Sequence, residues 1–233
     1  MEDKDEKLSA HLEALRAVLI RCFTALGLAF IPLFLAAPYA IDILIKLLIG
    51  NHDIALNYFS PMEVFILQIK VAAVLDILLC FPYVAYQIWQ FVLPALYDNE
   101  RKFIRSIVLS SASLFIFGVL FCLFFILPLI INFGLSFAND NLKAVLGISN
   151  IVSLSLWLSI IFGVMFQFPL VTYSLIKSKI VSYQSVKDKR PYVFVIILII
   201  AAVLTPPDIV SQLMLAVPTY LLFEIGLYFS KNI

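Results

Sequence analysis

Long apolar stretches, each almost free of charge, alternate with short polar segments along the whole chain. Most of these stretches reach the roughly 20 residues that a helix needs to cross the hydrocarbon core of a bilayer, whereas the fifth is shorter and requires a thinned bilayer or flanking residues. The pattern predicts an all-α membrane protein: one domain over residues 1–233 with six transmembrane helices, at about 18–38, 64–92, 107–133, 151–176, 192–204 and 209–229.

Helix-breaking residues add detail to this plan. Prolines lie inside most spans and predict kinked helices in a concave bundle, at Pro32, Pro82, Pro128, Pro169 and Pro218. Before the first span, apolar residues at helical spacing in residues 8–17 predict an amphipathic helix on the membrane surface, which then turns inward. A second interfacial helix is expected over residues 39–48. Ser60, Pro61 and Glu63 form a helix start, with Ser60 as the cap and Glu63 reaching back.

The composition excludes a water-soluble domain. Hydrophobic residues make up 63% of the chain and charged residues 13%, and the mean hydropathy is +1.06. A soluble domain has about 45–50% apolar and about 25% charged residues. The net charge of +1 gives no concentrated basic surface, so no nucleic-acid partner is expected.

The basic residues orient the spans. Nearly all of the 16 lysines and arginines fall on one side if the N-terminus is cytoplasmic; the exceptions are Lys46 and Lys143 on the opposite side and Lys70 within the second span. The positive-inside rule therefore places the N-terminus in the cytoplasm, and an even number of spans returns the C-terminus there.

Among the polar residues inside the spans, these are the candidate functional residues: Asp76, Lys70, Gln167 and Glu224. A charged Asp76 facing lipid at the bilayer centre costs about 2.5–3.5 kcal/mol, so it should face protein or be protonated. Two interpretations stay open. These groups pair with one another or with the backbone and fix helix packing, or they form the relay of a transporter for a small solute or ion.

Covalent chemistry has little support in the sequence. Only seven glycines occur, without a phosphate-binding loop, and Cys22, Cys80 and Cys122 lie in apolar segments without metal-ligand spacing. No Gly-flanked serine nucleophile and no membrane histidine pair is present. We therefore expect no enzyme activity, no cofactor and no metal site.

Six short motifs occur in a specific order along nearly the whole chain. They are His11–Arg16, Tyr86–Tyr97 continuing into Glu100–Lys102, Phe166–Pro169, Lys189–Tyr192, Leu204–Asp208 with Ser211 and Gln212, and Phe223–Gly226. By these motifs the chain resembles TatC, the receptor subunit of the twin-arginine protein translocase.

The resemblance implies a function and a location. TatC proteins are six-span receptors of the cytoplasmic (inner) membrane that bind the signal peptides of folded export substrates at their cytoplasmic face. They work with the single-span subunits TatA and TatB and with further copies of themselves, and the proton motive force drives export. The partners expected here are therefore twin-arginine signal peptides, TatA and TatB, other copies of the chain and membrane lipid.

The resemblance also implies the site residues. Two adjacent guanidinium groups need carboxylates in a low-dielectric setting, and Glu13 and Glu100 match the family's pair. The implied pocket adds an apolar wall and cations that keep the carboxylates ionised: Phe91, Leu96, Tyr97, Arg16, Arg101 and Lys102. The alternatives are an ordinary surface pair of Glu13 with Arg16 and a solvated loop acid at Glu100.

A second implied surface contacts the partner helices. Gln167, Thr205 and Gln212 match the family positions. The family often carries a carboxylate where this chain has Gln167, so that residue can hydrogen-bond but cannot carry charge. Asp76 matches no family motif, and its role stays open.

Overall fold

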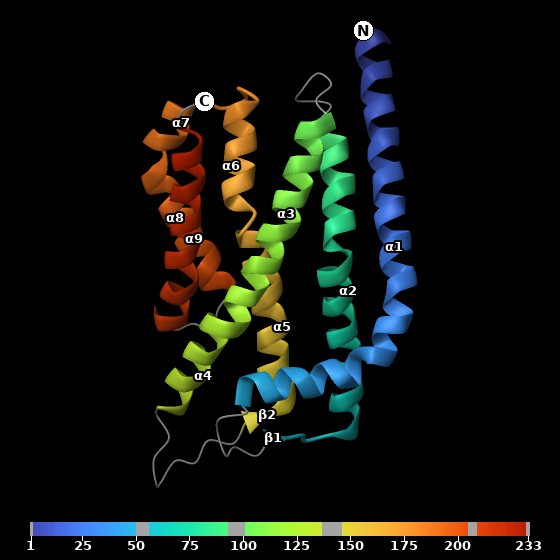
Figure 1. The fold of residues 1–233 in the computed structure, drawn as a ribbon, viewed down its shortest axis with the longest axis vertical. Helices are drawn as coiled ribbons and strands as arrows, with labels where there is room; N and C mark the ends of the chain where they lie inside the picture. The colour runs from blue at the N-terminus through green and yellow to red at the C-terminus, as the bar shows by residue number, and fades with distance from the viewer. Residues whose placement is uncertain (1, 50–55, 93–100, 137–145, 205–208, 232–233) are drawn as a thin grey trace. The chain divides into compact units, whose positions relative to one another are not determined.

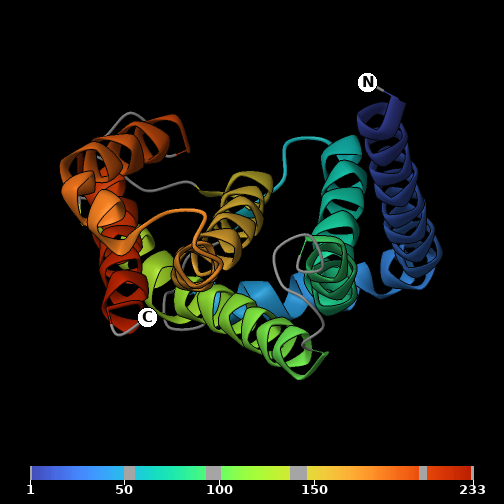
Figure 2. The same cartoon turned by 90° about the horizontal axis from the view of Figure 1, so that it is seen from above.

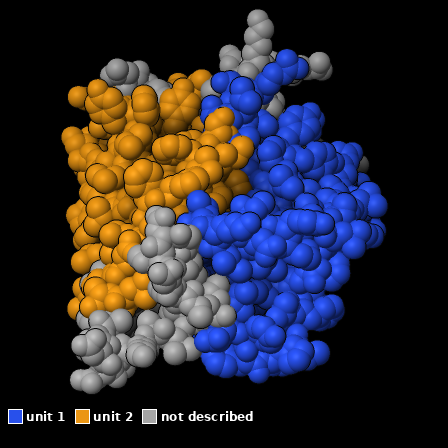
Figure 3. Space-filling view, turned by 60° about the horizontal axis from the view of Figure 1, so that its bottom comes forward, with its two compact units in different colours: residues 1–112, 145–157 blue, residues 113–144, 158–233 orange. Residues whose placement is uncertain are grey.

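The computed structural model describes residues 2–49, 56–92, 101–136, 146–204 and 209–231. It divides into two compact units, residues 1–112 with 145–157 and residues 113–144 with 158–233 (Figure 3). Each unit is described by itself. The single domain expected from the sequence stays a prediction.

The described residues are almost entirely helical (Figure 1). The first part of the chain forms α1 (Glu2–Ile49), β1 (Leu56–Asn57), α2 (Pro61–Val92) and α3 (Arg101–Phe121). The middle forms a π-helical segment, η2 (Cys122–Ile126), then α4 (Leu127–Leu135), β2 (Leu146–Gly147) and α5 (Ile148–Met165). The last part forms α6 (Phe168–Lys177), α7 (Tyr183–Asp188), α8 (Arg190–Leu204) and α9 (Ile209–Phe229).

Five stretches of helix within the described residues are long and apolar enough to cross a membrane: Leu12–Leu48, Pro61–Phe91, Arg105–Leu135, Ile148–Lys177 and Gln212–Phe229. A shorter apolar helix, Arg190–Val203, corresponds to the short fifth span of the sequence analysis. Large apolar side chains are exposed along all of them, as lipid-facing helices require. The fold is that of an all-helical membrane protein.

Helix α1 departs from the prediction. The expected turn after residue 17 is wrong, because α1 continues through it without interruption. No glycine or proline lies between residues 17 and 26, so nothing there breaks the backbone hydrogen bonds. The helix instead bends in its last third, which carries Pro38, and the expected helix over residues 39–48 forms beyond that bend (Figure 1).

The bend near Pro38 is stabilised by the neighbouring helix. Proline has no N–H, so Pro38 leaves the carbonyl of Phe34, four residues earlier, without its helical donor. The side chain of Gln68 on α2 supplies one, with Nε2 3.1 Å from the Phe34 oxygen. Helices α1 and α2 lie side by side (Figures 1 and 2), so a polar side chain of one completes the backbone of the other.

The core of the first unit lies around this contact. Its buried side chains come from α1, α2 and α5, with Ala37, Leu67 and Ala72 fully buried, and it comprises Ala37, Ile41, Leu67, Val71, Ala72, Val152 and Leu156. Small residues at Ala37 and Ala72 let the helices approach closely, as is common between membrane helices.

The start of α2 confirms the predicted cap with one difference. The Ser60 hydroxyl accepts a hydrogen bond from the Met62 N–H at 3.3 Å, and α2 begins at Pro61. The Glu63 carboxylate reaches back to the N–H of Phe59, at 2.8 Å, one residue before the position that a standard capping box uses.

Prolines also shape the second unit. Before Pro128 the helix widens into the π-helical segment η2, in which the Leu127 N–H donates to the carbonyl of Cys122. Before Pro169 the helix breaks between α5 and α6. The predicted kinks at these two prolines are confirmed.

Glycines allow close packing in the second unit. A Cβ at Gly226 on α9 would lie 2.7 Å from the Cα of Pro169 on α6, closer than real Cβ contacts. Gly226 therefore lets α9 approach the backbone of α6 at the break in the α5–α6 span. Two sequence motifs, Phe166–Pro169 and Phe223–Gly226, meet at this contact.

We predict that Gly226→Ala destabilises the chain. The added methyl group meets backbone atoms that cannot move aside, a form of overpacking that costs about 1–3 kcal/mol. The measurement is the midpoint of thermal unfolding of the purified chain in detergent. Gly27→Ala is the matched control: nothing lies within 4 Å of its Cβ position, so alanine should preserve or raise stability. Equal midpoints for the two variants would contradict the prediction.

Candidate functional site

The N-terminal half of α1 presents an exposed apolar stripe with charged residues beside it. Leu12, Leu15 and Leu19 are all exposed, as are Glu13 and Arg16. A shallow groove follows this stripe, lined by Leu12, Leu15, Arg16, Leu19, Ile20, Phe23 and Thr24. At about 100° per residue, Glu13 falls on the same side of the helix as Ile20 and Thr24, along one edge of the groove.

Glu13 and Arg16 do not form the surface pair that the three-residue spacing allows. Within the described part of the chain, Glu13 makes no hydrogen bond or ion pair with Arg16 or any other residue. A carboxylate without an internal partner keeps its full capacity to accept hydrogen bonds from a ligand.

The structure describes only some of the other predicted pocket residues. Phe91 is half-buried in the last turn of α2. Arg101 and Lys102 begin α3, but their side chains are not described. Leu96, Tyr97 and Glu100 lie outside the described residues, so the meeting of Glu100 with Glu13 stays a prediction.

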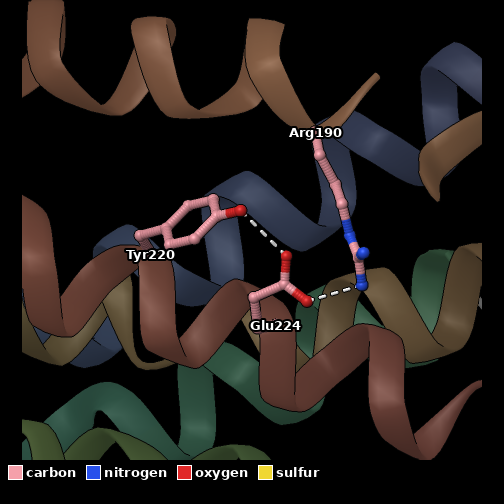
Figure 4. Close-up of polar contacts among 3 residues, drawn as sticks. All are labelled: Arg190, Tyr220 and Glu224. Carbon is pink, nitrogen blue, oxygen red and sulfur yellow. Dashed lines mark hydrogen bonds and ion pairs between the residues drawn. The ribbon is translucent and has the colours of Figure 1, made fainter. Parts of the chain in front are cut away.

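A half-buried polar cluster joins α8 to α9 in the second unit (Figure 4). The guanidinium of Arg190 lies 2.7 Å from the Glu224 carboxylate, Nη2 to Oε2. The Tyr220 hydroxyl, one turn earlier on α9, donates to the other carboxylate oxygen at 2.9 Å. Glu224 thus has a fixed cation and a fixed hydrogen-bond donor, which is the arrangement of a structural ion pair.

From the sequence, Glu224 is a candidate functional residue, but its pairing with Arg190 is not predicted. Arg190 was counted among the cytoplasmic cations that orient the chain. The available signal was topological: the start of the fifth span and the end of the sixth lie at the same predicted membrane face, so Arg190 and Glu224 share one depth.

The two candidate residues on α2, Lys70 and Asp76, have separate partners. The possible pairing of Asp76 with Lys70 is not formed: Asp76 is buried and accepts from the Cys80 thiol at 3.4 Å, whereas Lys70 donates to Ser153 on α5 at 3.2 Å. Six residues separate Asp76 from Lys70, which places them on different faces of one helix.

Two of the predicted partner-contact residues bond to backbone carbonyls. Gln167 precedes α6 at the break in its span, and its Nε2 lies 3.4 Å from the Gly163 oxygen. Gln212 on α9 donates to the Leu198 carbonyl of α8 at 3.1 Å. The third, Thr205, lies outside the described residues.

The model of the family named "Sec-independent protein translocase protein (TatC)" matches residues 10–218. The chain belongs to the TatC family. The match includes the groove of α1 and every motif except the last, Phe223–Gly226. The predicted resemblance is confirmed.

Individual TatC proteins match this chain over nearly its whole length. The chain is 35% identical to the TatC of Carboxydothermus hydrogenoformans over 234 residues, covering 100% of this chain and 96% of the relative. It is 34% identical to the TatC of Escherichia coli K12, covering 97% of this chain and 88% of the relative.

The fold is similar to that of a solved TatC. A crystal structure described as the twin-arginine translocase receptor TatC superposes with a TM-score of 0.87 at 31% sequence identity. The alignment covers 95% of this chain and 98% of that one. The chain is accordingly a component of a protein translocase, and the alternative of a small-solute transporter is set aside.

We predict that Arg190 and Glu224 are energetically coupled. Arg190→Ala or Glu224→Ala alone leaves the other charge half-buried without its partner, so each should lower the thermal midpoint in detergent. The double variant should be less destabilised than the sum of the two, with a coupling of about 0.5–3 kcal/mol. Tyr220→Phe, which removes one hydrogen bond, should cost less than either. Strict additivity would show that the pair contributes nothing to holding α8.

Proposed function

We propose that this chain is the signal-peptide receptor of a twin-arginine translocase and that Glu13 is one of two carboxylates that bind the paired arginines. The observation that carries the proposal is the combination on α1: an exposed carboxylate with no partner among the described residues, at the edge of an exposed apolar groove. The second carboxylate is Glu100, supplied by the segment between α2 and α3.

The chemistry of the groove fits such a ligand. Arginine forms forked, charge-assisted hydrogen bonds to carboxylates that lysine cannot reproduce. The apolar groove next to Glu13 supplies a surface for the hydrophobic part of a signal peptide. In this proposal Phe91, Leu96 and Tyr97 form the remaining apolar wall, and Arg16, Arg101 and Lys102 supply positive charge beside the two carboxylates.

The proposed topology has six spans, with both termini in the cytoplasm of the inner membrane. Helix α8 serves as the short fifth span, and the bent end of α1 lies on the outer surface. The cytoplasmic side then carries the N-terminal half of α1, so Glu13 faces the compartment from which folded precursors arrive.

The partner subunits are proposed to be TatA and TatB, which bind along the face of Gln167, Thr205 and Gln212, with further copies of the chain in the assembly. Binding of the signal peptide shifts the packing of those single-span helices. The proton motive force supplies the energy, and the receptor itself binds and repositions.

We predict that Glu13→Lys and Glu100→Lys each abolish export of a twin-arginine reporter while leaving the amount of chain in the membrane unchanged. Loss of one charge-assisted hydrogen-bond pair weakens binding about ten- to a hundredfold, and charge reversal adds repulsion. Asp42→Lys is the matched control, since Asp42 is also an exposed carboxylate on α1 but lies near its other end. Normal export by the double reversal would rule out the assignment.

Direct contact is tested by photo-crosslinking. A photoreactive residue at position 20, on the same side of α1 as Glu13, leaves both carboxylates in place. It should label a precursor with paired arginines, and should label the same precursor with paired lysines at least several-fold less. A photoreactive residue at position 42 should label neither. Equal labelling of both precursors from position 20 would show that the two carboxylates do not select for arginine.

A further inference from the structure

Lys70 is an exposed cation inside an apolar helix. It lies in α2, whose composition fits a membrane span, and its Nζ donates to the Ser153 hydroxyl of α5 at 3.2 Å. Within the described residues no carboxylate pairs with it. A neutral hydroxyl does not compensate a positive charge, and an uncompensated charge in a span is costly.

The structure fixes the end of the helices toward which Lys70 reaches. Strands β1 and β2 pair in parallel, directly before α5 and shortly before α2, so α2 and α5 begin at the same end. Lys70 lies about 14 Å along α2 from Pro61, whereas Ser153 lies only about 8 Å along α5 from Ile148. The bond to Ser153 therefore draws the ammonium group toward the helix starts.

Aromatic residues mark that end as a membrane interface. Tyr58 and Phe59, which directly follow β1, are 65% and 75% exposed. Tyrosine is enriched where membrane spans meet the headgroup region. Lys70 thus extends from the hydrocarbon side toward the level of lipid phosphates, as snorkelling lysines do.

The surface around Lys70 is apolar and open. On α2, Ile66 and Ile77 share its face, one turn before and two turns after it, and are 47% and 40% exposed. On α5, Trp157 follows Ser153 by one turn and is 53% exposed. A cation and a hydroxyl therefore lie at the headgroup end of a path of exposed apolar side chains.

We propose that Lys70 and Ser153 bind the phosphate of an anionic phospholipid whose acyl chains lie along Ile77 and Trp157. Charge complementarity selects the occupant. The phosphate of phosphatidylglycerol carries no compensating cation, so it neutralises Lys70, whereas the choline of phosphatidylcholine already compensates its own phosphate. In the proposed topology this lipid belongs to the outer leaflet.

The test uses Trp157 as the reporter. The chain has two tryptophans, so Trp89→Phe leaves Trp157 alone. This variant is placed in phosphatidylcholine nanodiscs that contain increasing fractions of acyl-brominated phosphatidylglycerol or, separately, brominated phosphatidylcholine. Half-maximal quenching should need about a fivefold lower fraction of phosphatidylglycerol, the factor expected for one basic residue at a lipid phosphate.

Variants separate charge from structure. In the same background, Lys70→Arg should keep the preference for phosphatidylglycerol, and Lys70→Met should remove it. Lys70→Gln keeps a polar side chain without the charge and should also remove the preference. Lys46→Met, which removes an exposed lysine of α1, is the matched control and should keep the preference.

Either of two results overturns the proposal: identical quenching by the two brominated lipids, or a preference that survives Lys70→Gln. Both leaflets of a nanodisc contain the same lipids and no signal peptide is present. The outcome is therefore independent of the proposed receptor function and of the orientation of the chain.

Discussion

The absence of water around the spans constrains every backbone carbonyl of this fold. A helix satisfies its own carbonyls until a proline removes a donor, and in hydrocarbon no solvent can replace it. At Pro38 the side chain of Gln68 donates to the Phe34 carbonyl from the adjacent helix. Before Pro128 the helix widens so that the Leu127 N–H reaches Cys122. Each bend therefore comes with a specific partner or a changed hydrogen-bond pattern, which makes the kinks defined features of the fold.

The same constraint accounts for the polar side chains in the second unit. Helix α8 has 15 residues, fewer than the roughly 20 that a helix needs to cross the hydrocarbon core. Its short apolar length alone therefore fixes its depth in the bilayer poorly. Two polar contacts tie it to α9: Arg190, its first residue, pairs with Glu224, and the Leu198 carbonyl in its middle accepts from Gln212. Specific contacts to a full-length neighbour thus substitute for hydrophobic length. The close approach of α9 to Pro169 at Gly226 links this pair of helices to α6.

The sequence predicted what local chemistry determines. The apolar stretches, the short fifth span, the Ser60 cap and the helix over residues 39–48 all follow from patterns within a few residues. The predicted turn after residue 17 is wrong, since α1 continues through that position. The sequence there changes from amphipathic to fully apolar, which changes the surroundings of the helix but does not interrupt its backbone hydrogen bonds. Tertiary partners were harder to predict: Lys70 with Ser153 and Arg190 with Glu224 join residues 83 and 34 positions apart, and no periodicity connects them.

The partners of two glutamates distinguish structure from recognition. Each carboxylate oxygen of Glu224 already accepts a hydrogen bond, one from Arg190 and the other from Tyr220, and the contact with Arg190 holds α8 to α9. Glu13 is exposed and unpaired within the described residues, although Arg16 lies one turn away on the same helix. Leaving Glu13 unpaired keeps its hydrogen-bonding capacity for an incoming cation, and the exposed apolar groove beside it favours a cation that is joined to a hydrophobic segment. The receptor proposal therefore rests on a carboxylate without a partner, beside an apolar surface that stays exposed, both among the residues that the structure describes.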